Sequence, residues 1–206
     1  MNVLEDVFEK QFVFHTYACR KNKGSHAAAR YAFKKAKSSR FFLKLDVRKY
    51  FDNINHLFLK NQLSRIIKDD KCLSLLFSII DGYSSSDSKK DEKGLPIGNL
   101  TSQFFANLYL SSFDHFVLEK LSPTGYARYM DDIVVVENSM EKLHSDFEKM
   151  SDFCGRNLAL SFKDPIFGNT KQGIPFLGWR ITKHGIFLLA NVSLKMDFPS
   201  TIPTIL

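Results

Sequence analysis

The stretch Tyr126-Ala-Arg-Tyr-Met-Asp-Asp-Ile-Val-Val-Val136 places two adjacent acids between two apolar runs. The runs 126–129 and 133–136 are typical of strands, and Met130-Asp131-Asp132 between them predicts a tight hairpin turn. Acids between apolar strands are costly to bury unless they bind cations or pair with bases. The hairpin tip is therefore a candidate cation site, although Asp is also a common residue of plain turns.

A further carboxylate, Asp46, ends the short predicted strand that begins at Phe41. Carboxylate oxygens combined with substrate phosphates are the ligands that Mg²⁺ prefers in such sites. Two such ions about 4 Å apart can activate an attacking hydroxyl and stabilise a leaving pyrophosphate. Asp46 brought next to Asp131 and Asp132 would complete an oxygen-rich site of that kind.

Around these strands, hydrophobic periodicity predicts several helices. They are expected over Met1–Phe14, Ser25–Ser38, His56–Lys68, Lys71–Ile80, Thr101–Leu121 and Met140–Leu158. Ser84–Lys93 reads as a polar surface loop, and a last hairpin is expected between Phe176–Thr182 and Ile186–Leu189. Strands joined by hairpins rather than by βαβ alternation predict an α+β fold, with an antiparallel sheet packed on helices.

Composition excludes several classes of protein. A chain of 206 residues that is 44% hydrophobic, with 20 Phe, is not a disordered or low-complexity sequence. It contains no apolar stretch near the ~20 residues that span a bilayer and no secretory signal at Met1, so no membrane association is expected. Cys19, Cys72 and Cys154 have neither disulfide-framework nor zinc-ligand spacing, which favours reduced thiols and a cytoplasmic location.

Positive charge is concentrated near the N-terminus. The net charge is +7, and the segment from Arg20 to Lys49 holds eleven of the 29 basic residues but one acid, Asp46. Such a concentration suits a polyanionic partner, because neutralised phosphates release counterions. On charge alone, a solvated basic helix explains it equally well.

Several motifs, in order along the chain, resemble those of reverse transcriptases. Tyr129-Met130-Asp131-Asp132 is similar to the family signature. The others are a fingers motif at 16–26, the first palm motif at 42–52, the loop and helix at 94–107, Lys163, and the primer-grip hairpin at 176–180. The resemblance extends from about Val3 to Thr182. It implies a right-hand polymerase palm, with partial fingers, that transfers a nucleotide from a dNTP to the 3′-OH of a DNA or cDNA primer on a template RNA.

The resemblance also implies roles for individual residues. Asp46, Asp131 and Asp132 would be catalytic and would bind two Mg²⁺ ions, or Mn²⁺ as a substitute, with the Val47 carbonyl as a further ligand. The residues that it places around the nucleotide are Arg20, Phe51, Ile97, Gly98, Gln103 and Lys163. Among these, Phe51 would gate against a ribose 2′-hydroxyl and Lys163 would assist the pyrophosphate. The primer grip would consist of Phe176, Leu177 and Gly178.

The same resemblance divides the chain. Residues 1–40 would be partial fingers, 41–175 the palm with fingers-side helices at about 55–93, 176–190 the primer-grip hairpin, and 191–206 a short tail. Compared with the family, we expect a preceding fingers segment and a full thumb to be missing. A truncated, non-catalytic remnant that binds nucleic acid is therefore one alternative to an active nucleotidyltransferase.

The loop at 97–103 indicates a subtype. Ile97-Gly-Asn-Leu-Thr-Ser-Gln103 is similar to the pattern of diversity-generating retroelement enzymes, where most reverse transcriptases have Gln at the position of Ile97. That subtype implies error-prone cDNA synthesis and a small basic accessory protein as partner. Loss of an amide donor beside the nucleotide leads us to expect that Ile97 lowers fidelity. The alternative is a reverse transcriptase of the group II intron or retron type.

Overall fold

A four-stranded antiparallel sheet forms the centre of the computed structural model, which describes residues 2–82, 92–96 and 98–189. Its strand order is β2-β3-β1-β4. The bounds are β1 Phe41–Asp46, β2 Gly125–Tyr129, β3 Asp132–Glu137 and β4 Ile166–Asn169. The expected α+β fold with an antiparallel sheet is thus confirmed, whereas β4 was missed.

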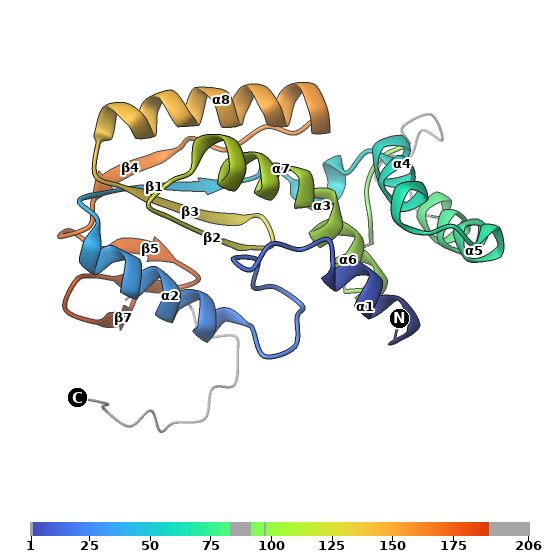
Figure 1. Ribbon diagram of the computed structural model, residues 1–206, viewed down its shortest axis with the longest axis horizontal. Helices are drawn as coiled ribbons and strands as arrows, with labels where there is room; N and C mark the ends of the chain where they lie inside the picture. Colours follow the sequence, from blue (N-terminus) through green and yellow to red (C-terminus); the bar gives the residue numbers. More distant parts are fainter. Residues whose placement is uncertain (1, 83–91, 97, 190–206) are drawn as a thin grey trace.

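The two faces of the sheet follow from the alternation of side chains along each strand. Leu43, Leu45 and Ile133 point into the larger core, on the side of α7 (Ser111–Phe116) and α8 (Met140–Leu158). Phe42 and Val134 point into a second core beneath α2, Ser25–Ser38. The sheet is therefore sandwiched between α7 and α8 on one face and α2 on the other (Figure 1).

A second, three-stranded sheet lies beside α2. It is formed by β5 Ile174–Phe176, β6 Trp179–Ile181 and β7 Ile186–Leu188. The sequence predicted one strand over Phe176–Thr182, which is wrong. Leu177 and Gly178 both have positive φ, 53° and 81°, and such a pair makes the tight two-residue turn that separates β5 from β6.

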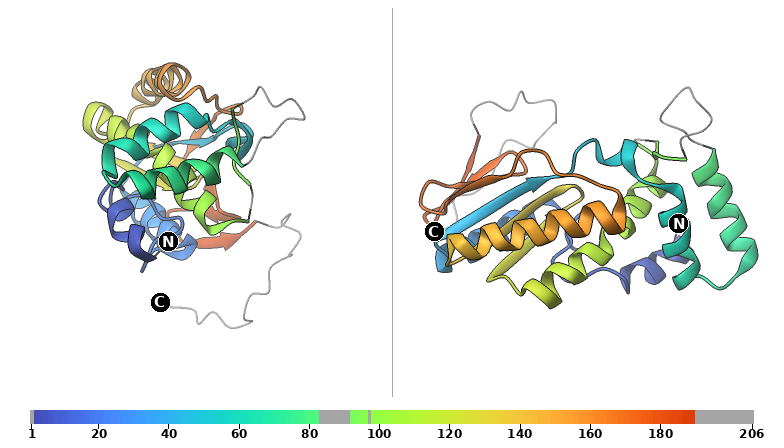
Figure 2. Two further views of the ribbon diagram at one scale, coloured as in Figure 1. Left: turned by 90° about the vertical axis from the view of Figure 1, so that its right-hand side faces the viewer. Right: turned by 90° about the horizontal axis from the view of Figure 1, so that it is seen from above.

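Helices gather beyond one end of the central sheet (Figure 2). They are α1 Asn2–Glu9, α3 Tyr50–Asn53, α4 His56–Ile66, α5 Asp70–Asp81 and α6 Leu100–Tyr109. Phe8 of α1 packs on Phe104 and Phe105 of α6, with ring centroids 5.9 and 6.4 Å apart. Asn55, Asp69 and Asn99 cap α4, α5 and α6 by accepting backbone N–H groups, as short polar side chains do at helix starts.

The long helix expected over Thr101–Leu121 is not continuous. α6 ends at Tyr109, α7 follows, and η1 (Val117–Leu121) is a π-helical turn. Leu110 leaves the helical region at φ −87° and ψ 0°, and the Tyr109 carbonyl accepts a hydrogen bond of 3.1 Å from Gln62 Nε2. Tertiary contacts thus override the local pattern at this point. The helix expected over Met1–Phe14 is also shorter, ending at Glu9.

Three expectations fall wholly or largely outside the described residues: the side chain of Ile97, the polar loop 84–93 and the tail 191–206. Within the ranges described above, none of the helices combines the length and apolar character needed to cross a bilayer.

Candidate active site

The pairing of β1 with β3 brings the predicted acids to one end of the central sheet. Asp46 and Asp132 are register partners in this antiparallel ladder. Asp131 lies in the adjoining turn between β2 and β3, and its carbonyl accepts a 3.3 Å hydrogen bond from the Val47 N–H. Met130 adopts a left-handed conformation there, with φ 57°. The expected hairpin is confirmed, and the structure brings Asp46, Val47, Asp131 and Asp132 together.

Two lysines pair with two of the three acids. Lys163 Nζ lies 2.8 Å from Asp46 Oδ1, and Lys44 Nζ lies 2.8 Å from Asp132 Oδ1. The Lys163 N–H also donates to the Asp46 carbonyl over 2.8 Å, so the backbone itself holds Lys163 beside the strand end. The structure therefore places Lys163 next to the acids, as the family resemblance implies.

Burial and mutual repulsion disfavour the charged form of these carboxylates. Burial raises the pKa of Asp131, and the negative charge of Asp46 raises it further. Burial also raises the pKa of Asp132, while Lys44 acts in the opposite direction. The hydrogen bond and charge of Asp46 raise the pKa of Lys163, which keeps that side chain protonated.

The donor set fits a divalent cation. In the part of the chain that the structure describes, no three His, Cys, Asp or Glu side chains are grouped closely enough to hold a metal ion as they stand. Two of the three carboxylates instead face Lys44 and Lys163. A cation at this sheet end would offset the repulsion that raises the pKa of Asp131, and carboxylate oxygens are hard ligands that suit Mg²⁺.

The turn at 176–178, which the sequence predicts to be the primer grip, also reaches this site. A backbone hydrogen bond from Leu177 to the Asp132 carboxylate opposes the effect of burial on the pKa of Asp132. Phe176, just before the turn, is buried in the second core, and Gly178 has the positive φ that the turn requires. The structure thus places the turn at 176–178 against one of the acids.

Phe51 and the loop before α6 lie together. The Phe51 carbonyl accepts the Leu95 N–H over 3.0 Å, and the Phe51 ring packs edge-on against Tyr50 with centroids 5.7 Å apart. Gly98 has φ +93°, a conformation that side chains rarely adopt, while an added Cβ would meet nothing within 4 Å. The need for glycine there is conformational rather than steric.

Gln103 and Arg20 form hydrogen bonds with residues outside the acidic group. Gln103 Oε1 accepts a 3.1 Å hydrogen bond from the Cys19 thiol. The Arg20 guanidinium is directed at both carboxylate oxygens of Glu9 and at the carbonyls of Val13 and Thr16. This arrangement favours a structural role for Arg20, and its predicted contact with the nucleotide stays a prediction.

Two charged residues near the acids were missed in the sequence. Lys44 stands in an otherwise apolar strand two residues before Asp46, so the period of a strand predicts that both point to one face. Arg128 is fully buried, at 0% exposure, within β2. A single Arg inside an apolar strand indicates a buried partner of opposite charge, and Arg128 in the run 126–129 gave that indication.

Comparison with curated proteins finds intron-encoded relatives. The chain is 27% identical over 157 residues to the group II intron-encoded protein LtrA of Lactococcus lactis subsp. cremoris, covering 70% of this chain and 26% of LtrA. It is 32% identical over 126 residues to an uncharacterized 91 kDa protein in the cob intron of Schizosaccharomyces pombe, covering 60% and 16%. The chain thus spans about a quarter or less of these relatives. Their names support the intron-type alternative rather than the expected diversity-generating subtype.

Solved structures share the fold. Apo telomerase from Candida tropicalis, truncated from its C-terminal domain, superposes with a TM-score of 0.67 at 14% identity, covering 91% of this chain and 44% of that one. Telomerase from Candida albicans in complex with a fragment of telomeric RNA gives 0.66 at 14% identity, covering 92% and 36%. At such identity the likeness shows the fold alone.

A family model covers most of the chain. The model described as "Reverse transcriptase (RNA-dependent DNA polymerase)" matches residues 1–181, which include the sheet end with its three acids and the turn at 176–178. The chain therefore belongs to the reverse transcriptase family.

Proposed function

We propose that this chain is the palm and part of the fingers of an RNA-directed DNA polymerase of the intron-encoded type. The observation that carries the proposal is the register pairing of Asp46 with Asp132, with Asp131 in the adjoining turn. The intron-encoded relatives support the subtype. The substrates would be a template RNA, a DNA or cDNA primer and dNTPs.

In this proposal Asp46 and Asp131 hold two Mg²⁺ ions, or Mn²⁺ in their place, with the Val47 carbonyl as a further ligand. The ions supply the charge that activates the primer 3′-OH and stabilises the leaving pyrophosphate. Asp132 is held by Lys44 and by the Leu177 backbone, so it orients the strand end and the primer-grip turn toward each other.

Lys163 has the properties of a group that meets the leaving phosphates. Its ammonium is kept protonated by Asp46, and its side chain is 57% exposed, so it can turn from Asp46 toward a bound triphosphate. Phe51 and Gly98 flank the loop before α6, where the sugar of the nucleotide would lie. Phosphoryl transfer relies on such positioning and charge neutralisation more than on covalent chemistry.

Primer extension tests the proposal. The chain is incubated with a DNA primer annealed to an RNA template, the four dNTPs and Mg²⁺, beside Asp131→Asn and the matched control Asp164→Asn. We expect extension by the parent chain and by Asp164→Asn, and a loss of at least about 100-fold with Asp131→Asn. Equal product from Asp131→Asn, or binding of the duplex without extension by the parent chain, would support the non-catalytic remnant instead.

The motif at 97–103 favours a second candidate, the diversity-generating subtype with its accessory protein. Its test is the error spectrum of the cDNA. That subtype predicts misincorporation concentrated at template adenines, reduced in Ile97→Gln. An error rate that is uniform over the four template bases and unchanged in Ile97→Gln would contradict the diversity-generating subtype and favour the intron type.

A further inference from the structure

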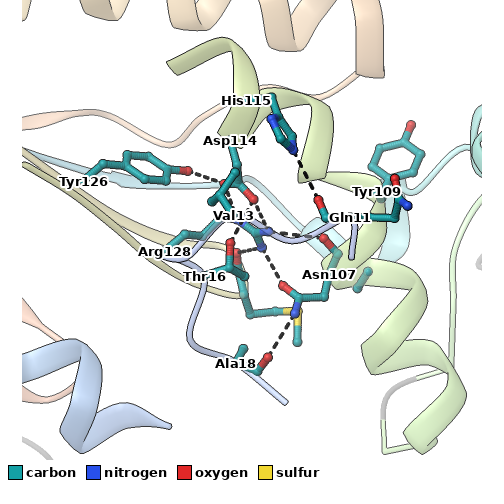
Figure 3. A network of polar contacts seen from close by, with 12 residues as sticks. Gln11, Val13, Thr16, Ala18, Asn107, Tyr109, Asp114, His115, Tyr126 and Arg128 are labelled. Atoms are coloured by element: carbon teal, nitrogen blue, oxygen red, sulfur yellow. Dashed lines mark hydrogen bonds and ion pairs between the residues drawn. The ribbon is translucent and has the colours of Figure 1, made fainter. Parts of the chain in front are cut away.

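Arg128 is a fully buried arginine paired with a fully buried aspartate. Both Arg128 and Asp114 of α7 are 0% exposed. Arg128 Nε lies 2.7 Å from Asp114 Oδ1 and Nη2 lies 2.6 Å from Asp114 Oδ2, a two-pronged pairing of guanidinium and carboxylate (Figure 3). Such pairs fix direction as well as charge, because the guanidinium is a rigid planar fork.

The remaining donors of Arg128 hold α6 and the turn that carries Asp131. Nη1 donates to Asn107 Oδ1 and to the Met130 carbonyl, both at 3.0 Å. Nη2 donates to the Asn107 carbonyl at 3.2 Å. All five N–H groups of the guanidinium therefore form hydrogen bonds, and one of them donates to Met130, the residue immediately before Asp131.

The same network ties in the segment at 15–18. Thr16 Oγ1 donates to Asp114 Oδ2 over 3.1 Å, and Asn107 Nδ2 donates to the Ala18 carbonyl over 2.9 Å. The Arg128 backbone pairs with this segment too, because its N–H donates to the His15 carbonyl at 3.0 Å and its carbonyl accepts the Tyr17 N–H at 2.9 Å. One buried group thus joins α6, α7, β2, the segment at 15–18 and the catalytic turn.

Met130 needs such support. Its φ of 57° is a left-handed conformation that few residues other than glycine adopt, and Asp131 follows it directly. A change in the Met130 peptide would redirect the Asp131 carboxylate. The Arg128–Met130 hydrogen bond fixes the carbonyl of this peptide.

Stability alone is a weak reason for such a pair. Burial by itself would lower the pKa of Arg128, and the charge and hydrogen bonds of Asp114 more than reverse this, so the guanidinium stays ionised. Replacing a buried ion pair by neutral groups of similar size is often neutral or stabilising in other proteins. What neutral groups cannot replace is the direction that the fork imposes on the Met130 carbonyl.

We propose that Arg128, with Asp114 and Asn107, is a positioning group that holds the Met130–Asp131 turn in the geometry that catalysis requires. This inference rests on the proposed function of Asp131. Arg128 acts through Met130 and does not itself meet substrate.

The test compares Arg128→Met with the double variant Arg128→Met/Asp114→Asn in the 206-residue chain. The single variant leaves an unpaired buried carboxylate and is expected to unfold at markedly lower urea. The double variant removes both charges, while the amide introduced by Asp114→Asn can still bond with Thr16 and Tyr126, so its urea midpoint is expected to recover. Ile80→Ala, in the distant α5, serves as a control for destabilisation elsewhere, since Ile80 is 0% exposed.

Two measurements on the folded variants report on the turn. The first is the methyl signal of Met130 in protein labelled with [¹³C-methyl]methionine, assigned by its loss in Met130→Leu. The second is Mn²⁺ affinity, measured by electron paramagnetic resonance with Mn²⁺ alone. We expect the double variant to show a broadened or split Met130 signal and about 10-fold weaker Mn²⁺ binding, as for loss of a group that orients a metal ligand, while Ile80→Ala retains one sharp signal and parent affinity.

A double variant with a single sharp Met130 signal would show that Arg128 is only structural and would overturn the inference. If the parent chain binds no Mn²⁺, the metal-dependent function fails, yet the Met130 signal still decides whether Arg128 holds the turn. The two failures are therefore distinguishable.

Discussion

Asp46 and Asp132 face each other at the last register position of the β1–β3 ladder, and each is paired with its own lysine, Lys163 and Lys44 respectively. Directly opposed residues in an antiparallel pair have Cα atoms about 5 Å apart, and like charges there are destabilising. The sheet end therefore carries an electrostatic cost that the two lysines offset in the protein alone. The proposed role in metal binding gives a functional reason for three acids at this position.

Removing one of these charges should stabilise the metal-free chain. Because burial and Asp46 raise the pKa of Asp131 in the folded state, ionised Asp131 opposes folding at neutral pH. The folded state then binds more protons than the unfolded state, so stability falls as pH rises from the unfolded pKa through the raised folded pKa. We expect Asp131→Asn to raise the free energy of unfolding by about 0.5 kcal/mol at pH 7, the typical size of a like-charge contact. The gain should shrink toward acidic pH, where the carboxyl is protonated in both states.

Urea denaturation with EDTA present measures this effect. Asp164→Asn, an exposed acid near Lys163, is the control and should leave stability unchanged. A loss of stability in Asp131→Asn at pH 7 would contradict the account of the acidic group.

Lys163→Gln should lower the rate of nucleotide transfer without weakening the binding of Mg²⁺. Loss of a protonated group beside the leaving phosphates is expected to lower kcat about 100-fold, within the usual range for a proton-donating side chain. The same change frees Asp46 from its ion pair, so the Mg²⁺ concentration for half-maximal rate should fall or stay constant. Steady-state primer extension at varied Mg²⁺ measures both quantities, with the exposed Lys171→Gln as control. An unchanged kcat in this variant would show that Lys163 takes no part in the reaction.

Two glycines should respond in opposite directions to the same substitution. At Gly168 in β4, an added Cβ would lie 2.6 Å from the Phe42 ring, so Gly168→Ala is expected to cost about 1–3 kcal/mol. At Gly155 in α8 nothing lies within 4 Å, and Ala favours the helix, so Gly155→Ala should gain about 0.5–1 kcal/mol. Thermal or urea denaturation of the two variants gives the comparison, and equal shifts would mean that β4 does not pack on Phe42 as described.

Arg20→Lys tests whether this arginine is structural. A lysine cannot reproduce the contacts with Glu9 and two carbonyls, so we expect a loss of about 1–3 kcal/mol in stability with the KM for dNTP changed less than about twofold. Glu9→Gln should show the same pattern, since it removes the partner. A large rise in KM with stability retained would instead restore the nucleotide-binding role implied by the family.

Local sequence patterns predicted the central hairpin, and the family resemblance predicted that its acids meet Asp46. Strand alternation and turn chemistry are local properties, and the ordered motifs supplied the family, which placed Lys163. The sequence did not reveal β4, because Ile166–Asn169 is short and gains its stability from pairing with β1 rather than from its own pattern.

Other features depended on distant contacts that no local pattern contains. The break at Leu110 accompanies a hydrogen bond from Gln62, which lies 47 residues from Tyr109 in sequence. The structural role of Arg20 depends on its ion pair with Glu9 of α1, a partner that the local pattern around Arg20 does not indicate. The preference for the diversity-generating subtype rested on one short loop, whereas the relatives that match 60–70% of the chain favour the intron type.

The location of a bound divalent cation shows whether this end of the central sheet is the catalytic centre. Crystals of the chain soaked with MnCl₂ and a dNTP would be measured at the manganese absorption edge. We expect an anomalous peak between the carboxylates of Asp46 and Asp131, absent in Asp131→Asn crystals treated in the same way. A peak elsewhere, or the same peak in the variant, would contradict the assignment of this sheet end as the catalytic centre.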